Sequence, residues 1–505
     1  MGIKRYIATT DTTITNAFKS NMNTRATGSN MGAADSMEIF HLYGQQMATS
    51  SENSRCLVKF PIDSITTART AGTVPASGSV AFYLRLFNAV HPFTVPSDFT
   101  LMVKASSRNW DEGTGTDLEA YTDYGYCNWV SAQSQSSGIT NWTAEGGDYQ
   151  TSLIYSSSFV DGTEDLLLDI TGLVEYWIAD TYSNYGVGVM LSSSHEVASG
   201  SLYTKKFFTR TSQYFYKRPI IEARWDSADK DDRSNFFYSS SLADADENKN
   251  TLFLYNYVRG QLKNLPHISA SAGEAGGTGS VYIHLYSGSA DNSKPNTNSL
   301  IQVSVSDAMS SSTAATGGWI STGIYTASVC LTAASTPLEK LFDVWSTGRV
   351  NDTQWHTGSI YPELLEASSY NPTPTHVTKV TNLKAAYFTH ETARFRLFVR
   401  EKGWSPSIYS KATAVIPNLN IDSGSYKIYR VADEYEVIPY GTGSDMETQL
   451  SFDVSGNYFD LDVELLEPGY AYAIKFAYYN GALSSYVEQP EVFKFRVEKN
   501  STNIE

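Results

Sequence analysis

The segment 205–226, KKFFTRTSQYFYKRPIIEARWD, decides between two readings of the fold. Basic and aromatic residues stand together in it, as on a nucleic-acid platform, where cations on one face alternate with aromatic side chains that stack on bases. In an extended chain, however, Phe207 and Thr209 face opposite to Phe208 and Arg210. This alternation separates the cations, and the segment ends in an apolar run. We therefore expect the last two strands of a β-sandwich.

The composition favours strands and disfavours nucleic acid as a partner. The chain has 505 residues, with 37 Lys and Arg against 53 Asp and Glu, and its net charge of −16 repels phosphate backbones. Only 18% of residues are charged, whereas 34 are Tyr and 23 are Phe, which is typical of strands and turns. The length exceeds that of one hydrophobic core, so we expect several domains.

The sequence indicates neither a disulfide framework nor a membrane span. Cys56, Cys127 and Cys330 are too few and too scattered for disulfides or a zinc cage, so we expect small buried side chains. No apolar run reaches about 18 residues, and residues 1–18 do not have the pattern of a signal peptide. A surface-type β composition without a secretion route fits a virus structural protein, made in the host cytoplasm and released by lysis.

Apolar residues alternate with polar ones in most segments, as in half-buried strands. SVAFYLRLF (79–87) and DFTLMVKAS (98–106) are the clearest cases. LLLDITGLVEYWIAD (166–180) instead has helical spacing, with Asp169 or Thr171 as the cap. We expect a single short helix in the first domain.

Two segments predict domain boundaries. DSADKDDRS (226–234) is typical of a solvated acidic linker, and SYNPTPTHVT (369–378) carries two prolines. The predicted domains are 1–225, 226–370 and 371–505. The fold class is all-β, with an N-terminal sandwich followed by two immunoglobulin/fibronectin-like β-sandwiches.

LLEPGYAYAIKF (465–476) resembles the turn before strand F of fibronectin-type or immunoglobulin-like sandwiches. In those domains a Leu, a Pro and a Tyr build a tyrosine corner, whose hydroxyl bonds to nearby backbone. Leu466, Pro468 and Tyr472 occupy these places and form the predicted structural corner.

Residues 1–225 resemble the DNRLRE domain, a jelly-roll module of the carbohydrate-binding-module type. The segment 205–226 is similar to its closing strands, and other pieces follow in the family's order, although long Tyr/Ser-rich insertions at 119–158 depart from it. The resemblance implies an N-terminal jelly-roll sandwich. The matching pieces are DTTITNAF (11–18), SRCLVKFPID (54–63), NWDEGTGTD (109–117), CNWVSA (127–132) and the helical segment 166–180.

The N-terminal block, joined to NTLFLYNYVRG (250–260) and an immunoglobulin-like unit, is similar to virion structural proteins of contractile-tailed phages of marine bacteria. This similarity implies a virion protein of the tail, neck or fibre that assembles with other virion proteins and as a homo-oligomer within the particle. The alternative is a glycan-recognising adhesin or receptor-binding fibre protein that binds a host surface glycan.

Catalytic motifs are absent from the sequence, so we expect no enzyme. No HExxH, GxSxG or P-loop pattern occurs. A glycosidase needs two facing carboxyl groups, and 53 acids supply pairs by chance. The groups that we considered are Trp110 with Asp111 and Glu112, and the three acids Asp161, Glu164 and Asp165.

The segment DADENKN (244–250) spaces acids and amides as in the first half of a calcium loop. Lys249 stands where such a loop needs glycine, and Tyr255 stands where it needs glutamate. We therefore expect an acidic hairpin turn, with no metal site and no cofactor. Jelly-roll modules can hold a structural calcium ion, which this sequence does not locate.

Five aromatic residues in the predicted loops are the candidate binding residues. Tyr and Trp provide a rigid contact area with a polar tip, suited to protein interfaces and to stacking on sugars. They either fill the loop side of the sandwich core, the more common role, or contact a partner, and a protein subunit is then favoured over a glycan. The residues are Trp110, Trp129, Trp142, Tyr124 and Tyr126.

Overall fold

The computed structural model divides into two compact units by its internal packing. The N-terminal unit comprises Ile3–Ala68 and Ser77–Arg224, and the C-terminal unit comprises Met1–Gly2, Arg69–Ala76 and Trp225–Glu505. The structure describes residues 2–90, 96–119, 126–135, 138–200, 202–244, 246–266, 281–287, 303–304, 314–332, 338, 340–346, 354–363, 374–404, 418–441 and 446–499.

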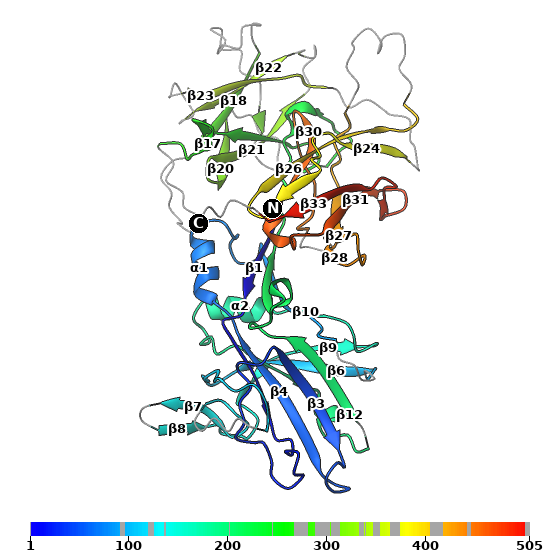
Figure 1. Ribbon diagram of the computed structural model, residues 1–505. Helices are drawn as coiled ribbons and strands as arrows, with labels where there is room; N and C mark the ends of the chain where they lie inside the picture. The colour runs from blue at the N-terminus through cyan, green and yellow to red at the C-terminus, as the bar shows by residue number, and fades with distance from the viewer. Residues whose placement is uncertain are drawn as a thin grey trace, which may run out of the picture. The chain divides into compact units, whose positions relative to one another are not determined.

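The all-β prediction is confirmed, and the N-terminal unit is built from two antiparallel sheets (Figure 1). The four-stranded sheet has the order β1 (Ile3–Ile7), β13 (Ile220–Arg224), β5 (Ala81–Leu86) and β10 (Leu166–Asp169). The seven-stranded sheet has the order β12 (Leu202–Phe208), β3 (Ser36–Tyr43), β4 (Ser51–Lys59), β11 (Val187–Leu191), β6 (Phe99–Ser106) and β9 (Tyr149–Phe159), with β2 (Thr10–Thr15) beside β4. A separate hairpin consists of β7 (Ser131–Gln135) and β8 (Gly138–Asn141).

The segment 205–226 contributes one strand to each sheet. β12 pairs with β3 in the larger sheet, and β13 pairs with β1 and β5 in the smaller one. The 3-10 turn η1 (Phe215–Lys217) lies between them. Two cations of the segment 205–226 have structural roles. Lys205 is buried, and Arg210 pairs with the carboxylate of Glu112.

The expectation of a single helix in this region was wrong, because its described residues contain three α-helices. α2 (Thr171–Ile178) is the expected one, but its N-cap is Ile170, which makes no side-chain cap hydrogen bond, so the expectation of Asp169 or Thr171 as the cap was wrong. The Asp169 carboxylate accepts a hydrogen bond from the Thr171 amide at 2.8 Å. α1 (Ile62–Thr70) and α3 (Ser193–Glu196) are additional. α1 buries only three apolar side chains and is rich in β-branched residues, which weaken the helical signal.

In the C-terminal unit, the described residues between 235 and 363 form an eight-stranded sheet around one apolar core. Its order is β14 (Tyr238–Ser239), β21 (Ile324–Thr332), β20 (Ala315–Ser321), β18 (Val281–Ser287), β22 (Leu341–Ser346) and β23 (Gln354–Ile360), with β15 (Asn250–Tyr255) and β19 (Val303–Ser304) beside β21. β16 (Tyr257–Val258) and β17 (Gln261–Leu262) form a short hairpin.

The last part of the chain has two sheets. One has the order β24 (His376–Val380), β26 (Thr392–Glu401), β30 (Gly456–Asp462) and β29 (Ser451–Asp453). The other has the order β25 (Ala386–Phe388), β33 (Phe493–Glu498), β31 (Ala471–Asn480), β27 (Gly424–Arg430) and β28 (Glu436–Ile438), with β32 (Ser485–Glu488) beside β31. The 3-10 turn η3 (Val463–Leu465) precedes β31.

The acidic segment 226–234 is a packed part of the C-terminal unit, and its prediction as a solvated linker was wrong. Asp231 donates its amide proton to the Phe452 carbonyl, and the Asp229 carbonyl accepts from the Phe452 amide, both at 3.0 Å. The segment therefore runs beside β29. It continues into the 3-10 turn η2 (Asp232–Ser234), where the Asp232 carboxylate accepts from the backbone of β15 at 2.7 Å. The acids are hydrogen-bond acceptors here, a role that composition does not reveal.

Candidate functional site

The three candidate tryptophans lie in a buried cluster instead of on the surface. This tryptophan layer packs on Ile14 and Leu57 of the seven-stranded sheet. The indole N–H of Trp110 donates to the Tyr185 carbonyl at 2.8 Å, and that of Trp142 donates to the Asn128 carbonyl at 2.9 Å. The layer consists of Trp110, Cys127, Trp129, Ala132 and Trp142, with Tyr149 against it.

Burial in the tryptophan layer removes these indoles as a binding surface. A buried indole stabilises by its large apolar area once its N–H is bonded, and that role is satisfied within the fold. Arg55 closes the layer, since its guanidinium lies 5.3 Å from the Trp129 ring and bonds the Glu196 carboxylate twice at 2.8 Å. Of the two tyrosines, Tyr126 is exposed, and Tyr124 lies outside the described residues.

The tyrosine-corner residues come together at the start of β31. The Tyr472 hydroxyl donates to the Glu467 carbonyl at 2.8 Å, five residues upstream, and the ring is buried. Leu466 is buried beside it, and Pro468 is half-buried. Gly469 follows with a φ of +95°, which only glycine adopts without strain. This arrangement fixes the turn.

Two of the acids considered for catalysis, Glu112 and Glu164, have structural partners. Glu112 pairs with Arg210 and accepts from the Asp11 amide at 2.8 Å. Glu164 accepts from the amides of Val160 and Asp161 at 2.8 and 2.7 Å. These contacts close loops.

The calcium-like segment 244–250 is a turn held by its own side chains in the described structure. Asn248 donates to the carbonyls of Ser240 and Ala243, and Lys249 pairs with Asp246 at 2.6 Å. Across the described ranges, no three His, Cys, Asp or Glu side chains form a group that could hold a metal ion. The three cysteines are buried and free.

The N-terminal unit contains a buried ion cluster around Glu222 on β13. Its carboxylate lies 2.6 Å from Arg5, 2.7 Å from Arg224 and 3.5 Å from Arg85. Burial alone would raise the pKa of Glu222, but the three guanidinium groups outweigh this effect and lower the pKa to about 2. The cluster ties β1, β5 and β13 together across the smaller sheet.

A buried ammonium group lies in the middle of β12. Lys205 Nζ donates to Asn88 Oδ1 and the Gly162 carbonyl at 2.8 Å, and to the Glu164 carbonyl at 2.7 Å. Burial lowers the pKa of Lys205 to about 8, against the opposing effect of Glu164. Three oxygens satisfy all three N–H donors, so this cation holds the loop 160–165 in place.

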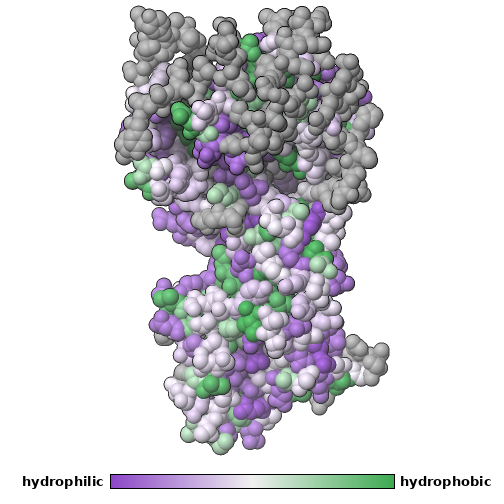
Figure 2. Space-filling view, turned by 180° about the vertical axis from the view of Figure 1, so that it is seen from behind, coloured by the Kyte–Doolittle hydropathy of each residue, from purple (hydrophilic) through white to green (hydrophobic). Residues whose placement is uncertain are grey.

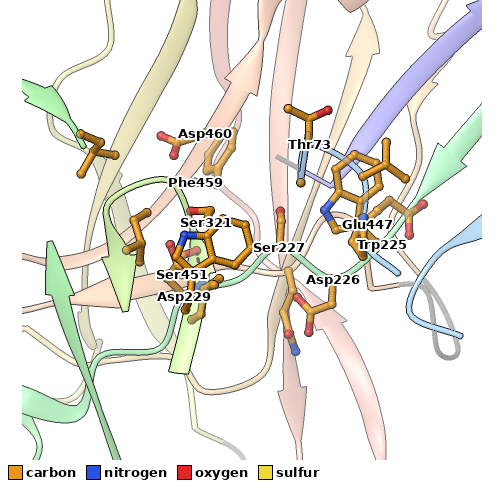
Figure 3. A pocket seen from close by; sticks show the side chains of 18 of the residues that line it. Thr73, Trp225, Asp226, Ser227, Asp229, Ser321, Glu447, Ser451, Phe459 and Asp460 are labelled. Carbon is orange, nitrogen blue, oxygen red and sulfur yellow. Dashed lines mark hydrogen bonds between the residues drawn. The ribbon is translucent and has the colours of Figure 1, made fainter. Parts of the chain in front are cut away.

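The candidate binding site is a pocket of the C-terminal unit with a volume of about 660 Å³. We call it the linker pocket, because residues of the acidic segment form its middle. Figure 3 shows Asp226 and Ser227 between two groups of side chains, one near Trp225 and Glu447 and the other near Asp229. The other walls come from the loop 72–76, β17, the β20–β21 hairpin, β26, β27, the segment 447–451 and β30.

Carboxylates outnumber cations in the linker pocket. Asp226, Asp229, Glu447 and Asp460 line it, and Arg394 is the cation among its described lining residues. Arg394 is already ion-paired, because its guanidinium donates two hydrogen bonds of 2.8 Å to the Asp460 carboxylate. Burial raises the pKa of Asp229 to about 6, and the neighbouring charge of Asp460 adds to this effect. The pocket therefore disfavours anions.

Sequence reasoning missed the linker pocket. Its residues come from eight separate segments, so no local spacing signals it. The usable signal was the tryptophan at position 225 next to a run of acids, which we assigned to a strand end and a solvated linker.

Comparisons with known proteins identify no family. No protein-family model matches the chain, and no curated protein matches it. Solved structures give weak similarities. A chimeric titin Z1Z2 tandem shares 12% identity over 44% of this chain and 85% of its own (TM-score 0.15). Tandem Ig repeats of Dlar share 10% identity over 44% of this chain and 91% of their own, with a TM-score of 0.13. Trypsin-activated α-2-macroglobulin from Escherichia coli shares 9% identity over 83% of this chain and 22% of its own, with a TM-score of 0.17.

No helix among the described residues is long and apolar enough to span a membrane. On the face in Figure 2, hydrophobic residues lie in small groups among polar ones. Small groups of this kind are ordinary on protein surfaces.

Proposed function

We propose that this protein is a non-enzymatic structural component of a tailed-phage virion, associated with the tail, neck or fibre, and that it supplies protein–protein assembly contacts. The observation that supports this role best is the strand β32. All four of its residues are exposed, and in the described structure β32 pairs with β31 alone. An exposed strand edge of this kind can accept a strand from another chain.

Exposed apolar side chains lie on β32 and beside it. Tyr486 and Val487 of β32 are exposed, as are Tyr479 and Leu483 of the same hairpin; we call these four residues the β32 edge. The rings of Tyr479 and Tyr486 lie 5.4 Å apart, and the Tyr486 hydroxyl is hydrogen-bonded to Ser423 at 2.8 Å. Oriented tyrosines give a large contact area at low entropic cost, which suits a subunit interface.

The partner at the β32 edge is a neighbouring virion protein or a second copy of this chain. Main-chain hydrogen bonds would extend the sheet of β31, and the tyrosines would pack on the partner strand. This mechanism uses rigid sandwiches and their edges, and it requires no cofactor. The mechanism is also consistent with the roles of the buried charged and tryptophan side chains, which stabilise the fold.

Mass spectrometry of purified phage particles tests the role directly, and a particle reconstruction then locates the chain. We expect Val487→Lys to reduce incorporation into particles, because a charge at the strand edge opposes pairing. Val454→Lys is the matched control, since Val454 is exposed in the β29–β30 turn, away from the β32 edge. Absence of the chain from particles, or equal incorporation of both variants, contradicts the proposal.

The alternative, a glycan-recognising adhesin or receptor-binding fibre, predicts a different result. Incubation of the full chain on an array of host surface glycans would then give specific binding, with little dependence on Val487. The assembly role alone predicts no such binding.

A further inference from the structure

The linker pocket combines features that neither the assembly role nor the β32 edge uses. Its volume of about 660 Å³ is within the range of pockets that enclose small ligands, about 300–1,000 Å³. It contains aromatic, hydroxyl and carboxylate side chains together. The class of ligand that fits the pocket depends on which of its polar atoms have no hydrogen-bond partner among the described residues.

Trp319 offers the pocket an apolar surface. Its indole N–H already donates to Asn264 Oδ1 at 3.1 Å, so the remaining ring atoms are carbon. The ring is half-buried on β20, next to the exposed Ile320. A ligand at this wall therefore packs C–H groups on the ring.

Trp225 offers a donor on another wall. The backbone amide of Trp225 bonds the Gly2 carbonyl at 2.9 Å, but its indole N–H has no hydrogen-bond acceptor among the described residues. Figure 3 places Trp225 near Thr73 and Glu447. A ligand oxygen can satisfy this donor.

Asp229 offers an acceptor. Its backbone amide donates to Ser451 Oγ at 3.0 Å, but within the described part of the chain its carboxylate accepts no hydrogen bond and forms no ion pair. The neighbouring Asp460 is occupied by Arg394, and Asp226 accepts from the Ala228 amide at 2.9 Å. Ligand hydroxyl groups are suitable donors to Asp229.

We propose that the linker pocket binds a short neutral oligosaccharide. Sugar rings combine an apolar C–H face with hydroxyl groups that both donate and accept, so one ligand satisfies Trp319, Trp225 and Asp229 together. An anion is opposed by the surplus of carboxylates. An alkyl cation would pair with Asp229 but would leave the Trp225 N–H without an acceptor. This binding site is independent of the assembly role, because the pocket and the β32 edge share no residue.

Isothermal titration calorimetry on the full chain tests this proposal. The probes are maltotriose, cellotriose and chitotriose, with cadaverine as an alkyl cation and citrate as an anion. We expect at least one trisaccharide to bind with a dissociation constant of about 1 mM or lower, and the two ions to bind more weakly.

Two variants connect the binding to the pocket. Trp319→Ala and Asp229→Asn should each weaken trisaccharide binding on the order of tenfold, the size expected for loss of one well-formed contact. Tyr361→Ala and Glu464→Gln are the controls, since both residues are exposed in the same unit and neither lines the pocket. Both should bind like the unmodified chain.

Thermal unfolding of each variant separates loss of binding from loss of fold, and Trp319→Phe, which keeps an aromatic ring, should retain most of the affinity. The proposal is overturned if no trisaccharide binds at millimolar concentration, if cadaverine binds more tightly than all three sugars, or if Asp229→Asn binds sugar with unchanged affinity. None of these outcomes bears on whether the chain is found in phage particles.

Discussion

Glu222 shows how one side chain can decide the stability of a sheet. Three arginines converge on its buried carboxylate, so Glu222→Gln would leave their charges without their central partner. We expect a loss of about 3–5 kcal/mol in the free energy of unfolding of the N-terminal unit. Chemical denaturation monitored by circular dichroism measures it. Asp63→Asn, a change at an exposed acid of the same unit, is the control and should have little effect.

The same carboxylate predicts how the unit responds to acid. Its folded pKa of about 2 lies below its ordinary value of 4.5, so the folded state binds fewer protons than the unfolded state between these values. The contribution of Glu222 to the free energy of unfolding is complete above pH 4.5 and is lost as the pH falls toward 2. Glu222→Gln should abolish this part of the acid dependence, and an unchanged acid profile would contradict the assignment.

Tyr472 is the second residue with a testable role. Tyr472→Phe keeps the ring and removes the hydroxyl that bonds the Glu467 carbonyl. We expect a loss of about 1 kcal/mol, the usual net value of such a bond, and a lower melting temperature of the C-terminal unit. Tyr470→Phe changes a neighbouring exposed tyrosine and should melt like the unmodified chain.

Residue roles were predictable where a local motif determined them. The spacing of Leu466, Pro468 and Tyr472 encodes a turn, so sequence alone indicated that the Tyr472 hydroxyl would bond to nearby backbone. The tryptophans were harder, because whether an indole in a long insertion is buried depends on what the insertion folds against. The sheet residues Ile14 and Leu57 supply that surface, far away in the sequence.

At the scale of elements, the tryptophan layer is a second core on the seven-stranded sheet. Trp142→Ala should cost about 3–5 kcal/mol, because it removes a large buried ring and leaves a cavity. Hydrogen exchange should show loss of protection first in residues 127–149, with β4, β6 and β11 still protected. Trp142→Phe should give a smaller effect, and unchanged exchange in the alanine variant would contradict a layer built around this indole.

The acidic segment 226–234 predicts an unusual pH dependence for the C-terminal unit. Burial raises the pKa values of Asp229, Asp231 and Asp232 from 3.8 to about 6. The folded state therefore binds more protons than the unfolded state between pH 4 and 6, and stability from these groups increases as the pH falls through this window.

Asp231→Asn isolates this effect, since Asp231 is buried and the amide oxygen can still accept from the Arg233 backbone. The variant should be more stable than the unmodified chain at pH 7.5, by about 2 kcal/mol, and should show no gain near pH 4. Asp246→Asn, at an exposed acid of the same unit, should show no such difference. A gain that is constant with pH would rule out titration of Asp231 as the cause.

The elements illustrate what patterns alone can show. Alternation predicted β5 and β6, and helical spacing predicted α2, because each buries one face with a regular period. The acidic segment has no such period. Its order comes from backbone pairing with β29 and carboxylate bonds to β15, and these partners are fixed only in the folded chain.

At the scale of the whole molecule, the two compact units predict two unfolding steps. Each unit has its own sheets and its own buried clusters. Differential scanning calorimetry should resolve two transitions, with Glu222→Gln lowering one melting temperature and Tyr472→Phe the other. A single transition, lowered equally by both changes, would show that the units unfold together.

The pairing of β1 with β13 has a consequence for protein engineering. Ile3 and Arg224 are directly opposite each other, so the first and last strands of the N-terminal sandwich are hydrogen-bonded neighbours. A domain whose two ends lie side by side can be inserted into a surface turn of an unrelated protein. It can also be circularly permuted, because a short linker joins the original ends. Evolution could have moved this sandwich between proteins as a cassette by the same route.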